Sequence, residues 1–404
     1  MKTTRGAALT FGVAVALIAG VTLGSAGTNV MPVFVDDFAA RFGMSGAGAG
    51  LVAAAQLMAT AVVTLLLAAR AARPGRVTMA RAGLAVAALG CLGAAAAPEP
   101  VTLLLANLLL GVGLGAVYAA ATAALAAVGD ADKASAVTIT GTVCLAALLI
   151  MAIPAVNDQW GGGAGFVLVA LCCLPAWFLV GRLPDDPGML EETVTGPGVP
   201  GGASARRAGP SVVLLTGTAV LWAVTYGAWS YASVLGREHT GMPASEVAVV
   251  LAVSSVVALV GAVVGPLAAQ RFGRMPSMAG FVAVQAVALG ALIVTDEPVL
   301  FIASAVLWQA CQLAVLVQTL AAAAIIDPSG RWVASLSGAG ALGTGAGPLV
   351  VGLILDGAGT GVLGILLAVG TFLASIPLLK MTAASTARAD AGAGAAQPGG
   401  TPVP

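Results

Sequence analysis

The sequence has little charge. Only 8% of its 404 residues are Asp, Glu, Lys or Arg, whereas soluble globular domains carry about 25%. A protein surface needs such charge in water and does not need it in lipid. Because 59% of the residues are hydrophobic, the composition excludes an ordinary soluble domain and indicates an integral membrane protein. The 17 basic and 17 acidic side chains cancel, which removes the positive field that attracts nucleic acid.

Residues that bind metals or form disulfides are also scarce. The chain has one histidine and five cysteines, and every cysteine lies within an apolar run. Such cysteines behave as small hydrophobic side chains, so the sequence predicts neither a metal site nor a disulfide framework. No paired acids, histidine cluster or activated nucleophile falls within an apolar run, so we expect no enzymatic activity and no cofactor.

Apolar runs of the length that a transmembrane helix needs, about 20 residues, make up most of the remaining sequence. None shows the alternation over ten residues that is typical of a membrane β-barrel. We therefore predict an all-α integral membrane protein with twelve transmembrane helices. The predicted spans are 8–34, 47–69, 78–96, 101–128, 135–156 and 163–181, then 211–235, 244–269, 276–294, 298–325, 332–355 and 360–379.

A polar segment at 182–210 divides these spans into two sets of six. It carries charges of both signs and several prolines, so it cannot bury enough apolar surface to fold. We predict an N-terminal six-helix bundle at 1–181, a cytoplasmic linker at 182–210, a C-terminal six-helix bundle at 211–380 and a disordered cytoplasmic tail at 381–404. Of the 17 basic residues only Arg41 and Arg237 fall on the side opposite the linker. This bias predicts that the linker and both termini are cytoplasmic.

The two halves repeat each other. Three pairs of loop residues recur 198 positions later, and each pair falls in the matching loop of its half. We infer two six-helix pseudo-repeats, an arrangement found in transporters whose halves are related by an axis along the membrane normal. The pairs are Gly75-Arg76 with Gly273-Arg274, Glu99-Pro100 with Glu297-Pro298, and Lys133 with Arg331.

This organisation resembles the major facilitator superfamily of secondary transporters over nearly the whole chain. The family has the motif Gly-x-x-x-Asp-Arg-x-Gly-Arg in the loop after its second helix. Residues 68–76 match it at Arg73, Gly75 and Arg76, and residues 266–274 match it at Arg271, Gly273 and Arg274. The resemblance implies that these six residues control the change between outward-facing and inward-facing states. Ala72 and Gln270 stand where the motif has Asp, so the family's latch between the halves is either missing or made by other groups.

Polar and aromatic side chains recur on single helical faces. In the seventh span Thr218, Trp222, Tyr226, Trp229 and Ser233 repeat every three or four residues, which places them on one face of a helix. The alternative for Trp229 and Tyr231 is the aromatic belt at the outer membrane surface.

The superfamily lines its central cavity mainly with the first, fourth, seventh and tenth helices. This resemblance and a polar stripe in the second span give the candidate substrate-binding residues. For their Asn and Gln side chains the alternative is a hydrogen bond that joins neighbouring helices. The candidates are Asn29, Gln56, Asn107, Tyr118, Trp222, Tyr226, Trp308, Gln309 and Gln312.

Acidic residues are absent from the middle of every predicted span. Asp36, Asp37, Glu246 and Asp356 lie at outer helix ends or loops and are the candidates for ion coupling. The alternative interpretation is that these four acids simply end helices in contact with solvent. The lack of charge at mid-membrane depth argues against a charged solute and against a simple proton relay through a buried acid.

These observations predict a secondary active transporter that moves a small uncharged or weakly polar organic solute across the plasma membrane by alternating access. Efflux of a metabolite or drug is the first hypothesis, and an uptake permease or facilitator is the alternative. A further alternative is a non-transporting membrane receptor or scaffold on the same fold. The expected partners are the solute, the lipid bilayer and, as a coupling ion to be tested, protons. We expect no nucleic-acid partner, and we expect a monomer.

Overall fold

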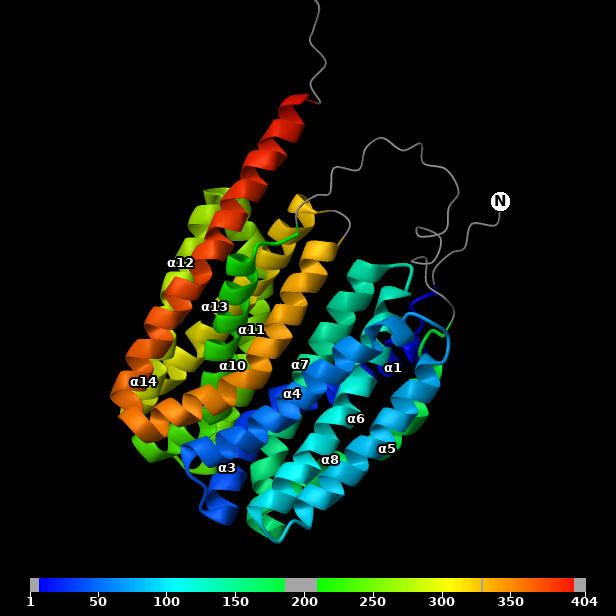
Figure 1. The fold of residues 1–404 in the computed structure, drawn as a ribbon, viewed down its shortest axis with the longest axis vertical. Coiled ribbons are helices and arrows are strands. Elements are labelled where there is room, and N and C mark those ends of the chain that lie inside the picture. The colour runs from blue at the N-terminus through cyan, green and yellow to red at the C-terminus, as the bar shows by residue number, and fades with distance from the viewer. Residues whose placement is uncertain (1–6, 186–208, 328–329, 396–404) are drawn as a thin grey trace, which may run out of the picture.

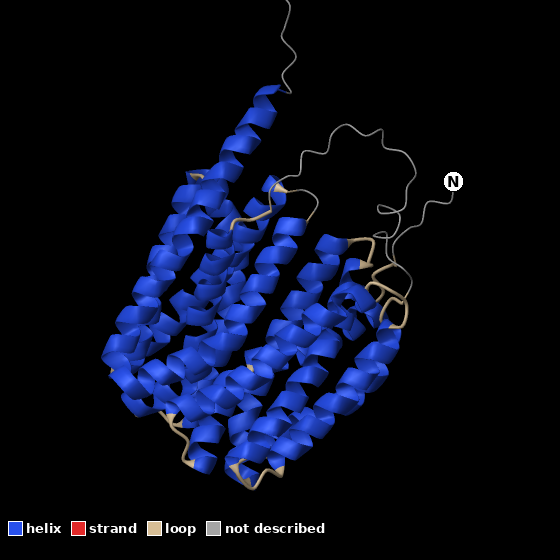
Figure 2. Ribbon diagram, viewed as in Figure 1, coloured by secondary structure: helices blue, strands red, loops and turns tan. Residues whose placement is uncertain are grey.

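The computed structural model describes residues 7–185, 209–327 and 330–395, which are helical apart from short connections and one isolated bridge (Figures 1 and 2). The N-terminal half contains α1 (Phe11–Gly24), α2 (Ala26–Asn29), α3 (Met31–Phe42), α4 (Gly46–Ala71), α5 (Arg76–Ala95), α6 (Pro100–Ala126), α7 (Ala131–Trp160), α8 (Ala164–Leu179) and the 3-10 turn η1 (Val180–Arg182). The C-terminal half contains α10 (Val212–Thr240), α11 (Ala244–Phe272), α12 (Arg274–Val294), α13 (Pro298–Ile326) and α14 (Arg331–Ala395).

In the described residues, ten helices are long and apolar enough to cross a membrane. α14 contains the last two predicted spans. The backbone at Gly359 (φ +76°) leaves helical geometry and divides α14 into two arms, one for each span. The first predicted span is divided instead into α1, α2 and α3. Each of the twelve predicted spans therefore corresponds to a helical segment, and the all-α prediction is confirmed.

The break between α2 and α3 follows from a proline. Pro32 has no N–H, so the carbonyl of Thr28 loses the partner that it would have one turn later. Val30, which precedes α3, has a non-helical backbone (φ −96°, ψ 6°). Beyond the break the chain continues as helix to Phe42, past the predicted end of the span at 34. Residues that the sequence placed at an outer helix end therefore lie inside α3.

The end of α14 also differs from the prediction. Residues 381–395 continue the helix, so the expected disorder is wrong for this part of the tail. Alanine is frequent here and is the strongest helix former. Arg388 Nη1 also donates to the carbonyl of Ile326 in α13 (2.8 Å). Residues 396–404 and residues 186–208 of the predicted linker lie outside the described part of the chain.

Helix boundaries match between the two halves. α5 begins after Gly75 (φ +105°) and α12 begins after Gly273 (φ +88°). α6 and α13 both begin at a proline that follows a glutamate. Figure 1 shows the two halves side by side, with α4 along α14, α3 along α10 and α7 along α11. Each half therefore contributes the same three spans of its repeat to the interface. The first spans of the two halves meet each other, and the second span of each half meets the fifth span of the other.

Candidate functional site

A cavity lies between the two halves and has two adjoining lobes. The larger lobe has a volume of about 450 Å³ and is bordered by α4, α10, α13 and α14, reaching Thr64, Ala334 and Leu378 on the linker side. The smaller lobe has a volume of about 150 Å³ and lies next to Trp229 and Trp308. Asn29, Trp222, Tyr226 and Gln312 line both lobes.

Two aromatic rings stand where the lobes meet. Trp222 and Tyr226 are four residues apart on α10, and their rings stack with centroids 5.2 Å apart and planes 13° apart. Trp222 rests on α14 at Gly340, where an added Cβ would lie 2.9 Å from the indole. The pair is a fixed aromatic surface that can stack on a planar solute.

The other predicted cavity residues fall into two groups. Tyr118 lines the larger lobe, and Trp308 and Gln309 line the smaller one. Gln56 and Asn107 are fully buried and line neither lobe, contrary to the prediction. Asn107 donates to the carbonyl of Leu103 in its own helix (2.9 Å), and a Cβ at Gly27 would collide with the Gln56 amide. These two side chains therefore lie at positions where α4 and α6 pack against neighbouring helices, although Thr64 and Tyr118 of the same helices reach the cavity.

Charged side chains are absent from the cavity wall. Among the residues that the structure describes, no Asp, Glu, Lys, Arg or His lines either lobe. The wall offers amide, hydroxyl and indole groups for hydrogen bonds, and the rest is apolar. A charged solute would lose its hydration there without gaining a counter-charge.

The outer end of the interface, opposite the linker, is closed by hydrogen bonds between the halves. Trp229 Nε1 donates to the carbonyl of Thr28 (3.1 Å), which is the carbonyl freed by Pro32. Tyr231 Oη lies within hydrogen-bond distance of the carbonyl of Gly46 in the other half and of Pro348 in its own half, and its single proton can be donated to either. Trp229 and Tyr231 are both buried, so the interpretation of these rings as an aromatic belt is wrong.

Two of the four candidate coupling acids are buried in α3. Asp36 and Asp37 are each 8% exposed, so their solvated-end alternative is wrong. Asp36 faces the other half: Ser233 Oγ donates to it (3.4 Å) and Arg237 Nε lies 3.4 Å from it. Asp37 accepts from the Asn157 amide (3.2 Å) and from the backbone N–H of Gly163 (3.1 Å), both in its own half. Only Asp36 of this pair therefore joins the halves.

The other two acids lie in exposed positions. Glu246 is in the first turn of α11 and is exposed, as a solvated helix end would be. Asp356 is in the first arm of α14, and its carboxylate accepts from the backbone N–H groups of Gly46 and Ala47 (both 2.8 Å). Those groups begin α4, where the helix dipole favours a negative charge. An acid of the C-terminal half thus caps a helix of the N-terminal half.

The loop that resembles the family motif is held by its own half. Asp185 Oδ1 accepts from the backbone N–H groups of Gly75 (2.8 Å) and Arg76 (2.7 Å). The buried Arg76 guanidinium donates to the carbonyls of Ala71 (2.7 Å) and Pro184 (3.1 Å). An acid of the segment that follows η1 thus caps the start of α5 within the N-terminal half.

The remaining motif positions lie on the same side of the molecule. Arg73 and Arg271 are exposed, and Arg271 lies over the Phe272 ring (5.7 Å to the centroid). Gly273 precedes α12, and the half-buried Arg274 is its first residue. These six residues occupy matching loops of the two halves.

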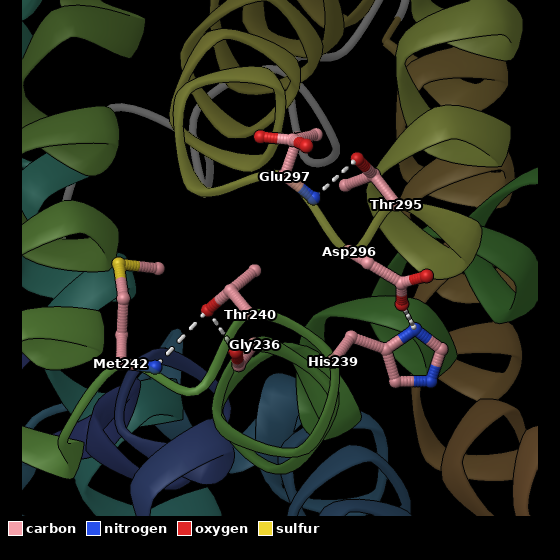
Figure 3. Close-up of polar contacts among 7 residues, drawn as sticks. All are labelled: Gly236, His239, Thr240, Met242, Thr295, Asp296 and Glu297. Carbon is pink, nitrogen blue, oxygen red and sulfur yellow. Dashed lines mark hydrogen bonds and ion pairs between the residues drawn. The ribbon is translucent and has the colours of Figure 1, made fainter.

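A further set of outer contacts lies within the C-terminal half (Figure 3). His239 Nδ1 is 3.5 Å from a carboxylate oxygen of Asp296. Thr240 Oγ1 accepts from the Met242 N–H (3.3 Å), and Thr295 Oγ1 accepts from the Glu297 N–H (3.2 Å). The His239–Asp296 contact joins the end of α10 to the connection between α12 and α13, the other two contacts each lie within one turn, and none of the three crosses to the other half.

Sequence reasoning missed several polar residues of the cavity, and one of them is an amide. Gln285 in α12 lines the larger lobe and is almost fully buried. The available signal was a single amide within an otherwise apolar run. The ninth span was not among the helices that the family resemblance assigned to the cavity.

Comparisons with known proteins agree with this geometry. The family model described as Major Facilitator Superfamily matches residues 16–327. Among solved structures, a mutant of the peptide transporter POT has a TM-score of 0.74 at 11% identity, covering 95% of this chain and 98% of its own. The nucleoside transporter NupG has a TM-score of 0.69 at 11% identity, covering 93% and 99%. A D-xylose–proton symporter has a TM-score of 0.68 at 15% identity, covering 92% and 98%. No curated protein sequence gives a significant match.

Proposed function

Because the chain belongs to the major facilitator superfamily, and is therefore a multi-pass membrane transporter and not an enzyme, we propose that it carries a small, planar, uncharged or weakly polar organic solute. The observation that carries this proposal is the cavity wall, which combines the Trp222–Tyr226 stack with an absence of charge among the described residues. Burying an ion in such a wall would cost more free energy than its contacts return.

The proposed direction is efflux of a metabolite or drug across the plasma membrane. The larger lobe lies on the linker side, and the charge bias predicts that this side is cytoplasmic. A cytoplasmic solute would then reach the aromatic pair while the outer end is closed. Uptake or facilitated diffusion is the alternative, and vesicles loaded on one side only distinguish the two directions.

We assign the outer closure to the contacts that join the halves there. Four contacts would have to break for the outer end to open. They are the hydrogen bonds from the Gly46 N–H to Asp356, from Trp229 to the Thr28 carbonyl and from Tyr231 to the Gly46 carbonyl, and the Asp36–Arg237 ion pair. On the linker side we assign control of the opposite closure to the motif residues Arg73, Gly75, Arg76, Arg271, Gly273 and Arg274.

Protons are the proposed coupling ion, with Asp36 as the carboxylate that binds them. One similar structure is a D-xylose–proton symporter, and Asp36 is the candidate acid that is buried and faces both halves. Addition of solute to proteoliposomes under a pH gradient should move protons. Solute flux without proton movement would exclude proton coupling and indicate facilitated diffusion.

We propose that the protein acts as a monomer with its linker and both termini in the cytoplasm. A cysteine introduced at Gly201 of the linker should react with a membrane-impermeant label from the cytoplasmic side alone. Labelling from outside would overturn this orientation.

The solute itself is best sought by thermal stabilisation of the purified protein, because a ligand that binds the native state raises its apparent stability. The first panel should contain neutral planar compounds, including nucleosides, since a nucleoside transporter shares the fold. Stabilisation by anionic or cationic compounds alone would contradict the proposed solute class. Solute binding without any flux would favour a receptor or scaffold.

A further inference from the structure

Gln285 combines deep burial with an unpartnered polar atom. The residue is 1% exposed, and it belongs to the wall of the larger lobe. Within the described part of the chain its side-chain Oε1 has no hydrogen-bond partner. Buried amides are nearly always hydrogen-bonded, so an unpaired one needs an explanation.

The nearby hydroxyl groups do not supply the missing bond. Thr218 and Thr319 line the same lobe from α10 and α13, two of the helices that contact α12. The Thr218 hydroxyl donates to the carbonyl of Leu214 (2.9 Å), and the Thr319 hydroxyl donates to that of Val315 (2.8 Å). A hydroxyl has a single proton to donate, so neither threonine can also donate to Gln285.

A second buried glutamine shows what a structural amide looks like in this half. Gln318 of α13 is 3% exposed and lines neither lobe. Its Oε1 accepts from Ser277 Oγ (3.2 Å), and its Nε2 donates to the carbonyl of Gly265 (3.3 Å). Gln318 therefore joins three helices by hydrogen bonds. Among the described residues three buried amides carry an unpartnered polar atom, Gln56, Asn107 and Gln285, and of these Gln285 is the one that lines the cavity.

We propose that Gln285 is a specificity-determining residue whose amide forms a hydrogen bond with the solute. This inference rests on the proposed function and narrows its solute class to planar molecules that carry a hydroxyl or amide substituent. Such a substituent both donates and accepts, so it can pair with either edge of the Gln285 amide. The planar body would meanwhile stack on Trp222 and Tyr226.

The test compares two neutral probes of the same shape, 2-naphthol and 2-methylnaphthalene, which differ by a hydroxyl against a methyl group. Binding is measured by equilibrium dialysis against the full-length protein in lipid nanodiscs, and empty nanodiscs give the blank for partitioning. We expect the wild type to bind 2-naphthol about tenfold more tightly, the usual effect of one hydrogen bond on affinity. Gln285→Leu should reduce this ratio to about one.

Gln318→Leu is the matched control. It removes a partnered amide, so it should lower the melting temperature and leave the probe preference intact. Gln285→Leu removes an unpartnered amide, so it should not lower the melting temperature. Gln285→Met provides a second apolar variant, with the same expected loss of preference.

The outcomes separate this inference from the function on which it rests. Equal binding of both probes by the wild type, or a preference that survives in both Gln285 variants, would overturn the role of Gln285 alone. Failure of the wild type to bind either probe would overturn the planar-solute proposal, and the role of Gln285 with it.

Discussion

The carboxylate of Asp356 and the backbone N–H of Gly46 lie 2.8 Å apart although they are separated by 310 positions in the chain. Ala47 donates to the same carboxylate, and Ser45 Oγ caps the same helix by accepting from Gly48. α4 therefore begins with N–H groups satisfied partly by its own half and partly by the other. The charge of Asp356 favours the conformation in which the outer ends of α4 and α14 touch.

Replacing Asp356 with Asn should weaken this outer closure. The amide keeps one acceptor oxygen but loses the charge that interacts with the helix dipole, a loss of about 1 kcal/mol. We expect a roughly fivefold shift toward molecules that are open on the outer side. The distance between spin labels at Ala40 and Ser245, in a variant without the five native cysteines, reports this opening.

Asp296→Asn is the matched control for that measurement. Asp296 is also an outer acid, but its partner is His239 of its own half (Figure 3). Its side chain is 84% exposed, and such exposed pairs contribute little to stability. An equal change in the label distances for both variants would argue against a specific role for Asp356.

Asp36→Asn should have a larger effect than Glu246→Gln. Asp36 is buried between the halves, and its carboxylate lies 3.4 Å from Arg237 Nε, a contact across the halves that an amide would weaken. Glu246 is exposed on the first turn of α11. We expect Asp36→Asn to abolish solute-driven proton movement in proteoliposomes and Glu246→Gln to preserve it. Normal proton movement with Asp36→Asn would exclude this residue as the coupling site.

Trp222→Ala should impair transport without affecting membrane insertion. The variant loses one ring of the stacked pair, and we expect the KM for a planar solute to rise about tenfold or more. Gln312→Ala should also impair flux, since Gln312 lines both lobes. Trp177→Ala is the control, because this tryptophan lies on α8 with Arg81 over its ring, away from the cavity. Unchanged flux in both cavity variants would refute the cavity assignment.

The tight packing inside the C-terminal half predicts opposite effects for two glycines. At Gly261 an added Cβ would collide with the carbonyl of Ala310 in α13, whereas at Gly280 it would meet no atom within 4 Å. Gly261→Ala should therefore destabilise the protein by about 1–3 kcal/mol. Gly280→Ala should be neutral or stabilise it by about 0.5 kcal/mol, because alanine restricts the unfolded chain. Thermal unfolding in detergent measures both, and equal melting temperatures would contradict the packing argument.

Hydropathy and charge were enough to predict the helical membrane fold, since span length and loop charge are properties of local sequence. The positions of the ends were less predictable. Pro32 breaks the first span without ending it, so α3 extends to Phe42 and buries Asp36 and Asp37. The helix after Met381 was missed because small residues were interpreted as disorder, although alanine favours helix.

The cavity was only partly predictable, because helical periodicity shows which residues share a face and not what that face meets. For Trp222, Tyr226 and Gln312 the face meets the cavity. Asn107 and Gln56 lie on equally polar stripes whose other members, Tyr118 and Thr64, reach the cavity, but these two side chains are themselves buried against other helices. The capping of α4 by Asp356 depends on a contact across the two halves, which no local pattern encodes.

Solute flux is the most direct test of the central claim, that a neutral planar solute crosses through the cavity between the halves. The compound that stabilises the purified protein best would be followed into proteoliposomes that contain this protein alone, beside a permanently charged analogue of the same shape. We expect saturable flux of the neutral compound above protein-free vesicles, its loss with Trp222→Ala, and no flux of the charged analogue. Equal transport of both compounds, or binding with no flux at all, would contradict the claim.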